Sequence, residues 1–375
     1  MVTYLHQLEN WPHLRLDQEK LAGRLAAVRH LQGRLLGRME GLGFTLRAEA
    51  TLRNLTEEIV KSNEIEGEKV DRDQVRSSIA RRLGIDIGAL TPADRSVEGV
   101  VEMMLDATQK YDQPLTKARL FSWHAALFPT GHSGIHRITA GGWRKDAAGP
   151  MQVISGSIGR ENVHYEAPAA ARVDEEMQAF LRWFNGGDHM DQVLRAGMAH
   201  LWFVTIHPFD DGNGRIARAL TDLLLARSEH SARRFYSMSA QIRKERSQYY
   251  QLLEATQKGN LDITRWMEWF LDCLGRAFEG AEAALADVFA KANFWERYQT
   301  ASLNDRQRTM LNKLLDGFDG KLTTSKWAKI TKCSPDTALR DIEGLIAKGI
   351  LKRDAARGRG TSYSLASAEA PTAIP

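Results

Sequence analysis

The chain has 375 residues, and 43% of them are hydrophobic, which is enough for two or three domains with buried cores. A formal net charge of +4 is too small to indicate a polyanionic partner for the whole chain, and Cys273 and Cys333 lack the spacing of a disulfide framework or a zinc site. Without a signal-peptide pattern or a long apolar run, the sequence predicts a cytoplasmic protein that does not cross a membrane.

Residues 14 to 83 are predicted to be helical. The polar residues in this region predict a solvated helix face, and His6 and His13 are expected at the surface rather than as ligands. Apolar residues recur at spacings of three and four, which is typical of a helix with one face in the core: Leu21, Leu25, Val28, Leu31 and Leu35.

The helical pattern continues over residues 95–128, where His124 has apolar neighbours and is expected to pack in the core. The following stretch, residues 131–151, is rich in glycine and short polar residues and predicts a loop. Two short strands around residues 156–161 predict a β-hairpin. Residues 191–205 predict a mostly apolar helix, which should therefore be buried.

That helix leads into HPFDDGNGRIAR, residues 207–218, the most informative stretch of the chain. The carboxylates of Asp210 and Asp211 are suitable ligands for a divalent cation, which prefers oxygen and usually retains water and substrate phosphates. Gly212 and Gly214 lack a Cβ and allow the backbone to approach an anion closely.

The remaining polar residues of the stretch also suit phosphate chemistry. Asn213 tolerates left-handed backbone geometry and offers an amide. Arg215 and Arg218 are three residues apart and share a face if a helix begins here, where the helix N-terminus itself attracts anions. His207 is the nearest titratable group and a suitable general base near pH 7. Together these residues predict nucleotidyl or phosphoryl transfer to a hydroxyl.

The run HPFDDGNGRIAR resembles the signature of Fic-domain proteins, and every position of that signature is filled. The resemblance implies a mainly α-helical Fic core with a short β-hairpin flap. It also implies transfer of AMP from ATP to a Ser, Thr or Tyr hydroxyl of a target protein or of the chain itself, with Mg²⁺ or Mn²⁺ as the metal ion.

The resemblance implies a role for each signature residue. His207 would deprotonate the target hydroxyl, Asp211 would bind the metal, and Arg218 would hold the terminal phosphate. Phe209 would be a buried anchor of the loop, and Asp210 fills the variable position and is expected to be a solvated charge. The phosphates would be cradled by Gly212, Asn213, Gly214 and Arg215.

An upstream segment, Ser62 to Gly67, has the form Ser, three residues, Glu, Gly. Alone this is a common surface-helix pattern, but beside the signature it resembles the inhibitory helix of Fic proteins, here about residues 55–70. The resemblance pairs Glu66 with Arg218. A carboxylate on that arginine would occupy the fork expected to bind the γ-phosphate, so ATP would bind with its phosphates out of line for attack.

Three further features follow from the resemblance. The opening residues, with Tyr4 and Trp11, resemble a small N-terminal domain that would brace the inhibitory helix. Tyr249 would lie beside the bound nucleotide, although the residues alone favour aromatic packing. The flap around residues 156–161 would hold an extended target segment by β-augmentation.

Residues 303–366 predict a separate unit of three helices and two strands that resembles a winged helix-turn-helix. Acidic residues on its third helix, Asp336, Asp341 and Glu343, would repel a DNA backbone. DNA binding and protein docking, including homodimer formation, therefore both stay open. The basic residues that could contact phosphates are Arg340, Lys352, Arg353, Arg357 and Arg359.

The expected organisation is an N-terminal helical domain (1–94), a Fic core (95–292), a winged helix (303–366) and a disordered tail (367–375). Besides autoinhibited AMP transfer, three alternatives stay open. The site could use another nucleotide or phosphate donor, or it could remove AMP with Glu66 orienting a water. The chain could also be a transcription regulator that senses nucleotide and binds DNA.

Overall fold

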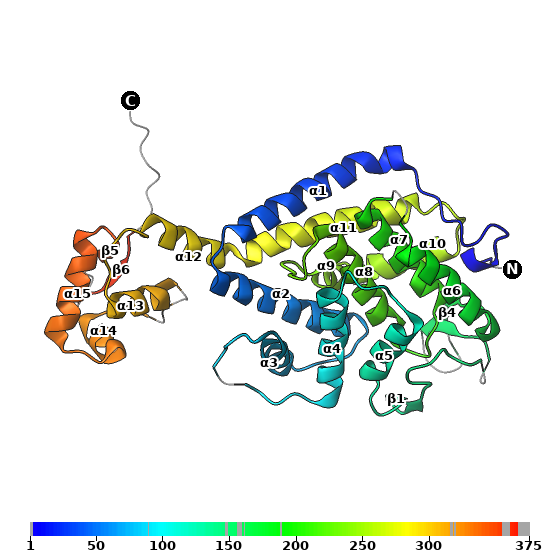
Figure 1. The fold of residues 1–375 in the computed structure, drawn as a ribbon, viewed down its shortest axis with the longest axis horizontal. Coiled ribbons are helices and arrows are strands. Elements are labelled where there is room, and N and C mark those ends of the chain that lie inside the picture. Colours follow the sequence, from blue (N-terminus) through cyan, green and yellow to red (C-terminus); the bar gives the residue numbers. More distant parts are fainter. Residues whose placement is uncertain are drawn as a thin grey trace. The chain divides into compact units, whose positions relative to one another are not determined.

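The computed structural model describes residues 3–88, 90–146, 149–155, 160, 162–187, 190–315, 318, 320–354 and 361–366. The chain divides into two compact units, Met1–Ala284 and Leu285–Pro375 (Figure 1). Within the described ranges, no helix is both long enough and apolar enough to span a bilayer.

The first unit consists of helices with two small antiparallel hairpins. Its helices are η1 (Leu5–Gln7), α1 (Gln18–Glu40), α2 (Phe44–Ile65), α3 (Arg72–Leu83), α4 (Arg95–Gln109), α5 (Lys117–Leu127), α6 (Ala170–Asn185), α7 (Gln192–Ile206), α8 (Asn213–Glu229), α9 (Met238–Lys244), α10 (Arg246–Gln257) and α11 (Thr264–Ala284). Its strands pair as β1 (His132–Ser133) with β2 (His136–Arg137), and β3 (Gln152–Ser155) with β4 (Asn162–Glu166).

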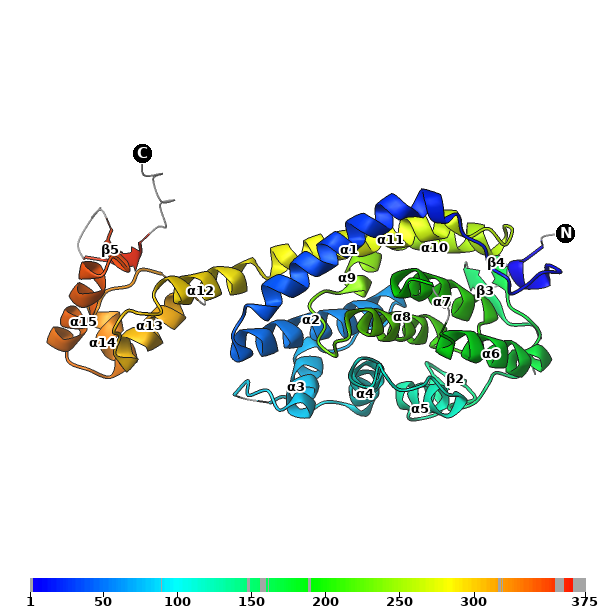
Figure 2. The ribbon, with the colours of Figure 1, turned by 45° about the horizontal axis from the view of Figure 1, so that its top comes forward.

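The long helices α1 and α11 lie side by side, as the blue and yellow ribbons show in Figures 1 and 2. Leu21, Val28 and Leu35 of α1 are buried, which confirms the predicted apolar stripe. At the edge of the contact, Arg24 forms an ion pair with Glu268 of α11 at 3.0 Å.

His6 is buried, so its predicted surface position is wrong. Its Nε2 lies 2.9 Å from the carbonyl oxygen of Glu166 in β4, and only 6% of the residue is exposed. The neighbouring Tyr4 packs edge-on against Tyr165 with ring centroids 5.1 Å apart. The cause is long-range: η1 covers the hairpin strand β4, which is about 160 residues away in sequence.

Residues 95–128, which the sequence predicts as a continuing helical pattern, form two separate helices, α4 and α5. Pro114 lies in the break, where its missing N–H and its fixed φ disfavour a continuous helix. Thr116 then caps α5, since its side chain accepts a hydrogen bond from the Arg119 N–H at 3.1 Å.

Helices α7 and α8 form the centre of the unit (Figure 2), and the signature begins directly after α7 and continues into α8. Every residue from Val193 to Ile206 of α7 is buried, as predicted for a mostly apolar helix. The predicted hairpin is also present in β3 and β4, whereas residues 156–159 and 161 of its turn lie outside the described residues. Tyr165 joins this hairpin to α7 by donating to the Thr205 carbonyl at 2.5 Å.

The second unit contains the predicted order of three helices and two strands, preceded by α12. Its core includes Trp327, Ile342 and Tyr363. Phe294 and Trp295 of α12 pack against that core, so the division falls between residues 284 and 285 rather than after 292. The elements are α12 (Ala286–Arg297), α13 (Asp305–Leu315), α14 (Thr324–Thr331), α15 (Pro335–Ala347), β5 (Leu351–Arg353) and β6 (Tyr363–Leu365).

One acidic residue of α15 is not available to repel DNA. Asp341 is 6% exposed, and its carboxylate accepts from Arg306 Nε at 2.7 Å and from Asn304 Nδ2 at 2.8 Å. Arg357 and Arg359 of the expected wing, and the tail from 367, lie outside the described residues. The winged-helix assignment and DNA binding stay predictions.

Two core histidines predict that acid destabilises the fold. Burial lowers the pKa of His200 to about 3 and that of His124 to about 4, from 6.5. The unfolded chain therefore binds more protons, so stability is complete above pH 6.5 and is lost as pH falls toward 4. We expect a loss of about 1 kcal/mol per pH unit for each histidine. Urea unfolding followed by circular dichroism at pH 7 and pH 5 measures it, and equal stability at both would contradict it.

Candidate active site

His207 stands at the C-terminal end of α7 in a left-handed conformation, with φ 52° and ψ 57°. This is uncommon for a residue with a Cβ and is typical of functional sites. Its Nδ1 lies 3.3 Å from the Val204 carbonyl, so Nδ1 carries the hydrogen and Nε2 has a free lone pair. Burial, together with the charge of Arg144, lowers the pKa of His207 to about 4. The imidazole is therefore neutral near pH 7 and can accept a proton.

The signature loop is held in shape by its own side chains. Asn213 Nδ2 donates to the Phe209 carbonyl at 2.8 Å, and its Oδ1 accepts from the Phe209 N–H at 3.0 Å. Phe209 is fully buried and stacks on His124 with centroids 4.1 Å apart, so His124 packs in the core as predicted. Because the Asn213 side chain is used within the loop, only its backbone N–H is available to a phosphate.

Residues from the preceding loop reinforce the signature. Arg144 Nε donates to the His207 carbonyl at 2.8 Å, and its side chain is fully buried. Asp210 is half-buried and accepts from the Thr139 N–H at 2.8 Å, so the prediction of a solvated charge is wrong. No local pattern predicts this contact, because the two residues are 71 positions apart.

Helix α8 begins at Asn213, so the first N–H groups after Gly212 have no partner within the helix. Arg215 follows on the first turn and Arg218 on the second, and both are almost completely buried. Within the described residues, Arg215 Nε and Arg218 Nη1 have no hydrogen-bond partner. Unpaired buried donors at a helix N-terminus favour binding of an anion.

Asp211 is the signature carboxylate that the sequence predicts as the metal ligand. Its Oδ1 accepts from the Gly212 N–H at 2.5 Å, and its Oδ2 accepts from the Ser133 hydroxyl. In the described part of the chain, no three His, Cys, Asp or Glu side chains gather as a metal site. A single carboxylate fits Mg²⁺, which is commonly held by one or two carboxylates together with water and substrate phosphates.

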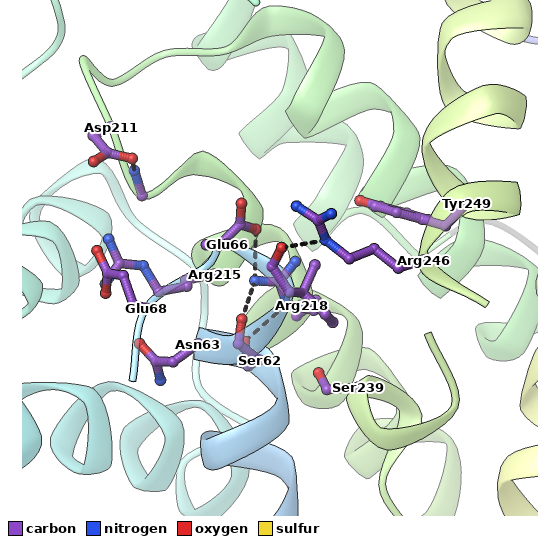
Figure 3. Close-up of polar contacts among 12 residues, drawn as sticks. Ser62, Asn63, Glu66, Glu68, Asp211, Arg215, Arg218, Ser239, Arg246 and Tyr249 are labelled. Carbon is purple, nitrogen blue, oxygen red and sulfur yellow. Dashed lines mark hydrogen bonds and ion pairs between the residues drawn. The ribbon is translucent and has the colours of Figure 1, made fainter. Parts of the chain in front are cut away.

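Glu66 and Arg218 form the ion pair that the sequence predicted, and Figure 3 shows the two side chains meeting. Glu66 Oε1 is 2.7 Å from Arg218 Nη2. Ser62 binds the same guanidinium twice, through Oγ to Nε and through its carbonyl to Nη2, both at 2.8 Å. Because these contacts occupy Nε and Nη2, only Nη1 of Arg218 is left for a phosphate.

Two glycines make this approach sterically possible. Gly67 follows Glu66 with φ +84°, a conformation that ends α2 and that side chains rarely adopt. A Cβ on Gly214 would lie 2.1 Å from Glu66 Oε1, so the carboxylate occupies the space that this glycine leaves open. Helix α2 itself ends at Ile65, and Glu66 is its C-terminal cap rather than a residue inside a helix reaching about residue 70.

Helix α10 fixes the end of α2 from the other side. Arg246 Nε donates to the Ile65 carbonyl at 2.7 Å, and its guanidinium covers the Tyr250 ring. The Tyr250 hydroxyl is 3.4 Å from Glu66 Oε2. Tyr249 is buried, and its hydroxyl lies 2.9 Å from His200 Nε2, in agreement with the aromatic packing expected from the residues alone. Tyr249 also lines the cavity described in the next paragraph.

A cavity of about 740 Å³ joins these groups. It lies between β3, β4, α10 and the signature, and His207, Gly214, Glu66 and Tyr249 all line it. A suitable general base, a helix N-terminus and Glu66, the partner of Arg218, therefore face one space, which suits transfer of a phosphorus centre to a hydroxyl.

A second acidic contact was not predicted. Glu68 Oε2 is 2.6 Å from Arg215 Nη1, across 147 residues, and Figure 3 shows it beside this arginine. Burial and the nearby charges of Asp211 and Glu66 raise the pKa of Glu68, although Arg215 opposes this. The only sequence signal was a charge close to the Ser62–Gly67 motif.

This contact predicts that Glu68→Gln strengthens ATP binding. Glu68 is 44% exposed, so solvent screens the pair and its removal should lower the ATP dissociation constant by about two- to fivefold. Calorimetric titration of the wild-type and Glu68→Gln chains with ATP measures this change. Unchanged or weaker binding would contradict a competition between Glu68 and phosphate for Arg215.

Two family models match the chain. The model of the Fic/DOC family matches residues 114–225, and that of a domain of unknown function, DUF4172, matches residues 4–85.

The chain is similar to proteins named protein adenylyltransferase Fic. It is 27% identical over 219 residues to that of Drosophila ananassae, covering 57% of this chain and 39% of the relative. It is 26% identical over 252 residues to that of Drosophila mojavensis, covering 64% and 45%. The chain spans less than half the length of these curated relatives.

The fold is also similar to a crystal structure of a Fic family protein from Desulfovibrio desulfuricans G20. The TM-score is 0.58 at 20% identity, over 96% of this chain and 99% of that chain. With the signature complete at residues 207–218 and the family model spanning it, the chain contains a Fic domain of the Fic/DOC family, preceded by a DUF4172 region.

Proposed function

We propose that the chain is a protein adenylyltransferase, which transfers AMP from ATP to a Ser, Thr or Tyr hydroxyl of a protein. The observation that carries the proposal is the neutral His207, whose free Nε2 lies on the same cavity as the N-terminus of α8. The names of the similar proteins support the same reaction.

In this reaction His207 Nε2 takes the proton of the target hydroxyl as its oxygen attacks the α-phosphorus of ATP, and pyrophosphate leaves. The backbone N–H groups of residues 212–215 and the guanidinium of Arg215 stabilise charge on the phosphates, and Arg218 holds the terminal phosphate. Tyr249 would lie beside the nucleotide, which its place in the lining of the same cavity supports.

Asp211 would hold the metal ion, Mg²⁺ or Mn²⁺, beside the phosphates. When bound, the ion neutralises phosphate charge and helps to orient the leaving group. The Ser133 hydroxyl and the Gly212 N–H both bind this carboxylate and would fix its direction.

We further propose that Glu66 and Ser62 inhibit the enzyme by occupying Arg218. Helix α2 is held firmly in this position. Beyond the Arg218 contacts, buried Glu58 accepts from the Ser237 hydroxyl at 2.7 Å and from the Ser239 N–H at 2.9 Å. Freeing Arg218 to bind the γ-phosphate therefore requires that several contacts of α2 break together, which is consistent with regulated inhibition.

Two differently labelled ATP molecules test the reaction class. The Glu66→Gly chain is incubated with magnesium and ATP labelled at either the α- or the γ-phosphate. AMP transfer predicts that the α-label becomes bound to protein and the γ-label does not. Incorporation of the γ-label would instead indicate phosphoryl transfer, and incorporation of neither would contradict the proposed function.

A further inference from the structure

A serine, a histidine and a glutamate form a hydrogen-bonded chain at the edge of the cavity. Ser155 Oγ is 2.6 Å from His164 Nε2, and His164 Nδ1 is 2.6 Å from Glu254 Oε2. The other oxygen of Glu254 accepts from Lys258 Nζ at 2.6 Å. An ionised carboxylate can only accept, so Nδ1 of His164 carries a hydrogen, and Nε2 is placed to accept from the serine hydroxyl.

The backbone of the hairpin aims this histidine. The pairing of β3 with β4 shifts register between Val153 and Ile154, and His164 is the extra residue of β4 at that point. A bulge of this kind redirects a side chain and commonly occurs beside active sites. Here it directs His164 to Glu254 on α10, so two elements far apart in sequence complete the chain of hydrogen bonds.

The serine faces the space in which the proposed reaction takes place. Ser155, His164 and Glu254 line the same cavity as His207 and Gly214. Ser155 is exposed, and the side chains of His164 and Glu254 are each 31% exposed. Burial alone would raise the pKa of Glu254, but its bonds with Lys258 and His164 lower it, which keeps the carboxylate charged.

We propose that Ser155 is an acceptor for AMP within the chain itself, with His164 as its own general base and Glu254 as the group that positions His164. A serine hydroxyl hydrogen-bonded to a carboxylate-oriented histidine is the usual arrangement of an activated nucleophile. The inference rests on the proposed adenylyl transfer and adds to it a modification site and a second base.

The step is a displacement at phosphorus. Ser155 Oγ forms a bond to the α-phosphorus of ATP while the bond from that phosphorus to the oxygen bridging the β-phosphate breaks. Pyrophosphate leaves with the electron pair of the broken bond. The hydroxyl proton moves to His164 Nε2, and the resulting imidazolium is stabilised by the Glu254 carboxylate.

The test maps AMP by peptide mass spectrometry after incubation of the Glu66→Gly chain with ATP and magnesium. AMP is expected on Ser155, with a rate constant that does not change on tenfold dilution of the protein, because donor and acceptor share one cavity. Adding Glu254→Gln should lower modification of Ser155 at least about tenfold, since the histidine loses its charged partner. Adding His164→Ala should lower it to a similar extent, because the serine hydroxyl then has no histidine partner.

Ser247→Ala is the matched control, because Ser247 lines the same cavity but has no histidine partner, and it should leave modification of Ser155 intact. AMP on other residues with none on Ser155 would overturn this inference and leave the proposed function standing. Unchanged modification of Ser155 in the Glu254→Gln and His164→Ala chains would overturn the role of His164. No AMP on any residue of the Glu66→Gly chain would contradict the proposed function itself.

Discussion

Replacement of Glu66 by glycine is expected to raise the rate of AMP transfer by about 100-fold. The 2.7 Å ion pair between Glu66 and Arg218 occupies the guanidinium that should receive the terminal phosphate. Displacement of ATP by about 1 Å from the in-line position can cost about 100-fold in rate, and the substitution removes its cause. Glycine is tolerated at this position because Glu66 caps the helix rather than lying inside it.

Transfer of α-labelled AMP to protein, measured for wild type and Glu66→Gly side by side, gives the ratio. Glu64→Gln is the matched control, since Glu64 lies on the same helix but binds Lys61 at 2.8 Å and does not touch Arg218. Equal rates for wild type and Glu66→Gly would refute the inhibitory role. A similar increase of the transfer rate in the Glu64→Gln chain would mean that any change at the C-terminal end of α2 raises the rate, and not loss of the Glu66–Arg218 pair in particular.

Removal of the His207 imidazole is expected to reduce transfer to a target protein by about 10²- to 10⁴-fold while leaving ATP binding intact. In the proposed reaction the free Nε2 of His207 would accept the hydroxyl proton, whereas the phosphates would bind to the N-terminus of α8 and to the arginines. In the Glu66→Gly background, the comparison of His207→Ala with His207→Asn separates chemistry from backbone strain, since asparagine tolerates a φ of 52° better than alanine does.

Both His207 variants should lose transfer and both should bind ATP in a calorimetric titration. His30→Ala, at an exposed position of α1, controls for loss of a histidine as such. Retained transfer in either His207 variant would exclude this residue as the base. Loss of ATP binding together with transfer would mean that the substitution disrupts the loop.

The signature could be interpreted from sequence because its functional groups are local. Twelve consecutive residues contain the base, the carboxylate and both arginines, and a helix start brings their side chains together. Glu66 could be assigned to Arg218 because a second short motif resembles a known inhibitory segment. The helices and the β3–β4 hairpin could be predicted for the same reason, because the spacing of apolar residues depends only on neighbouring positions in the chain.

Contacts made across the fold could not be predicted in this way. Asp210 was expected in solvent and instead binds the Thr139 N–H, and His6 was expected at the surface and instead packs on β4. Glu68 meets Arg215 only because α2 ends beside the start of α8. In each case the partner is chosen by packing rather than by neighbouring residues.

The most direct test of the central claim is intact-mass analysis of the Glu66→Gly chain incubated with ATP, magnesium and an unfractionated mixture of acceptor proteins. It is compared with the Glu66→Gly/His207→Ala chain, both carrying Ser155→Ala so that the flap serine does not contribute. The account predicts addition of AMP residues to the chain or to acceptors only when His207 is present. AMP addition of equal extent in both chains, or in neither, would contradict it.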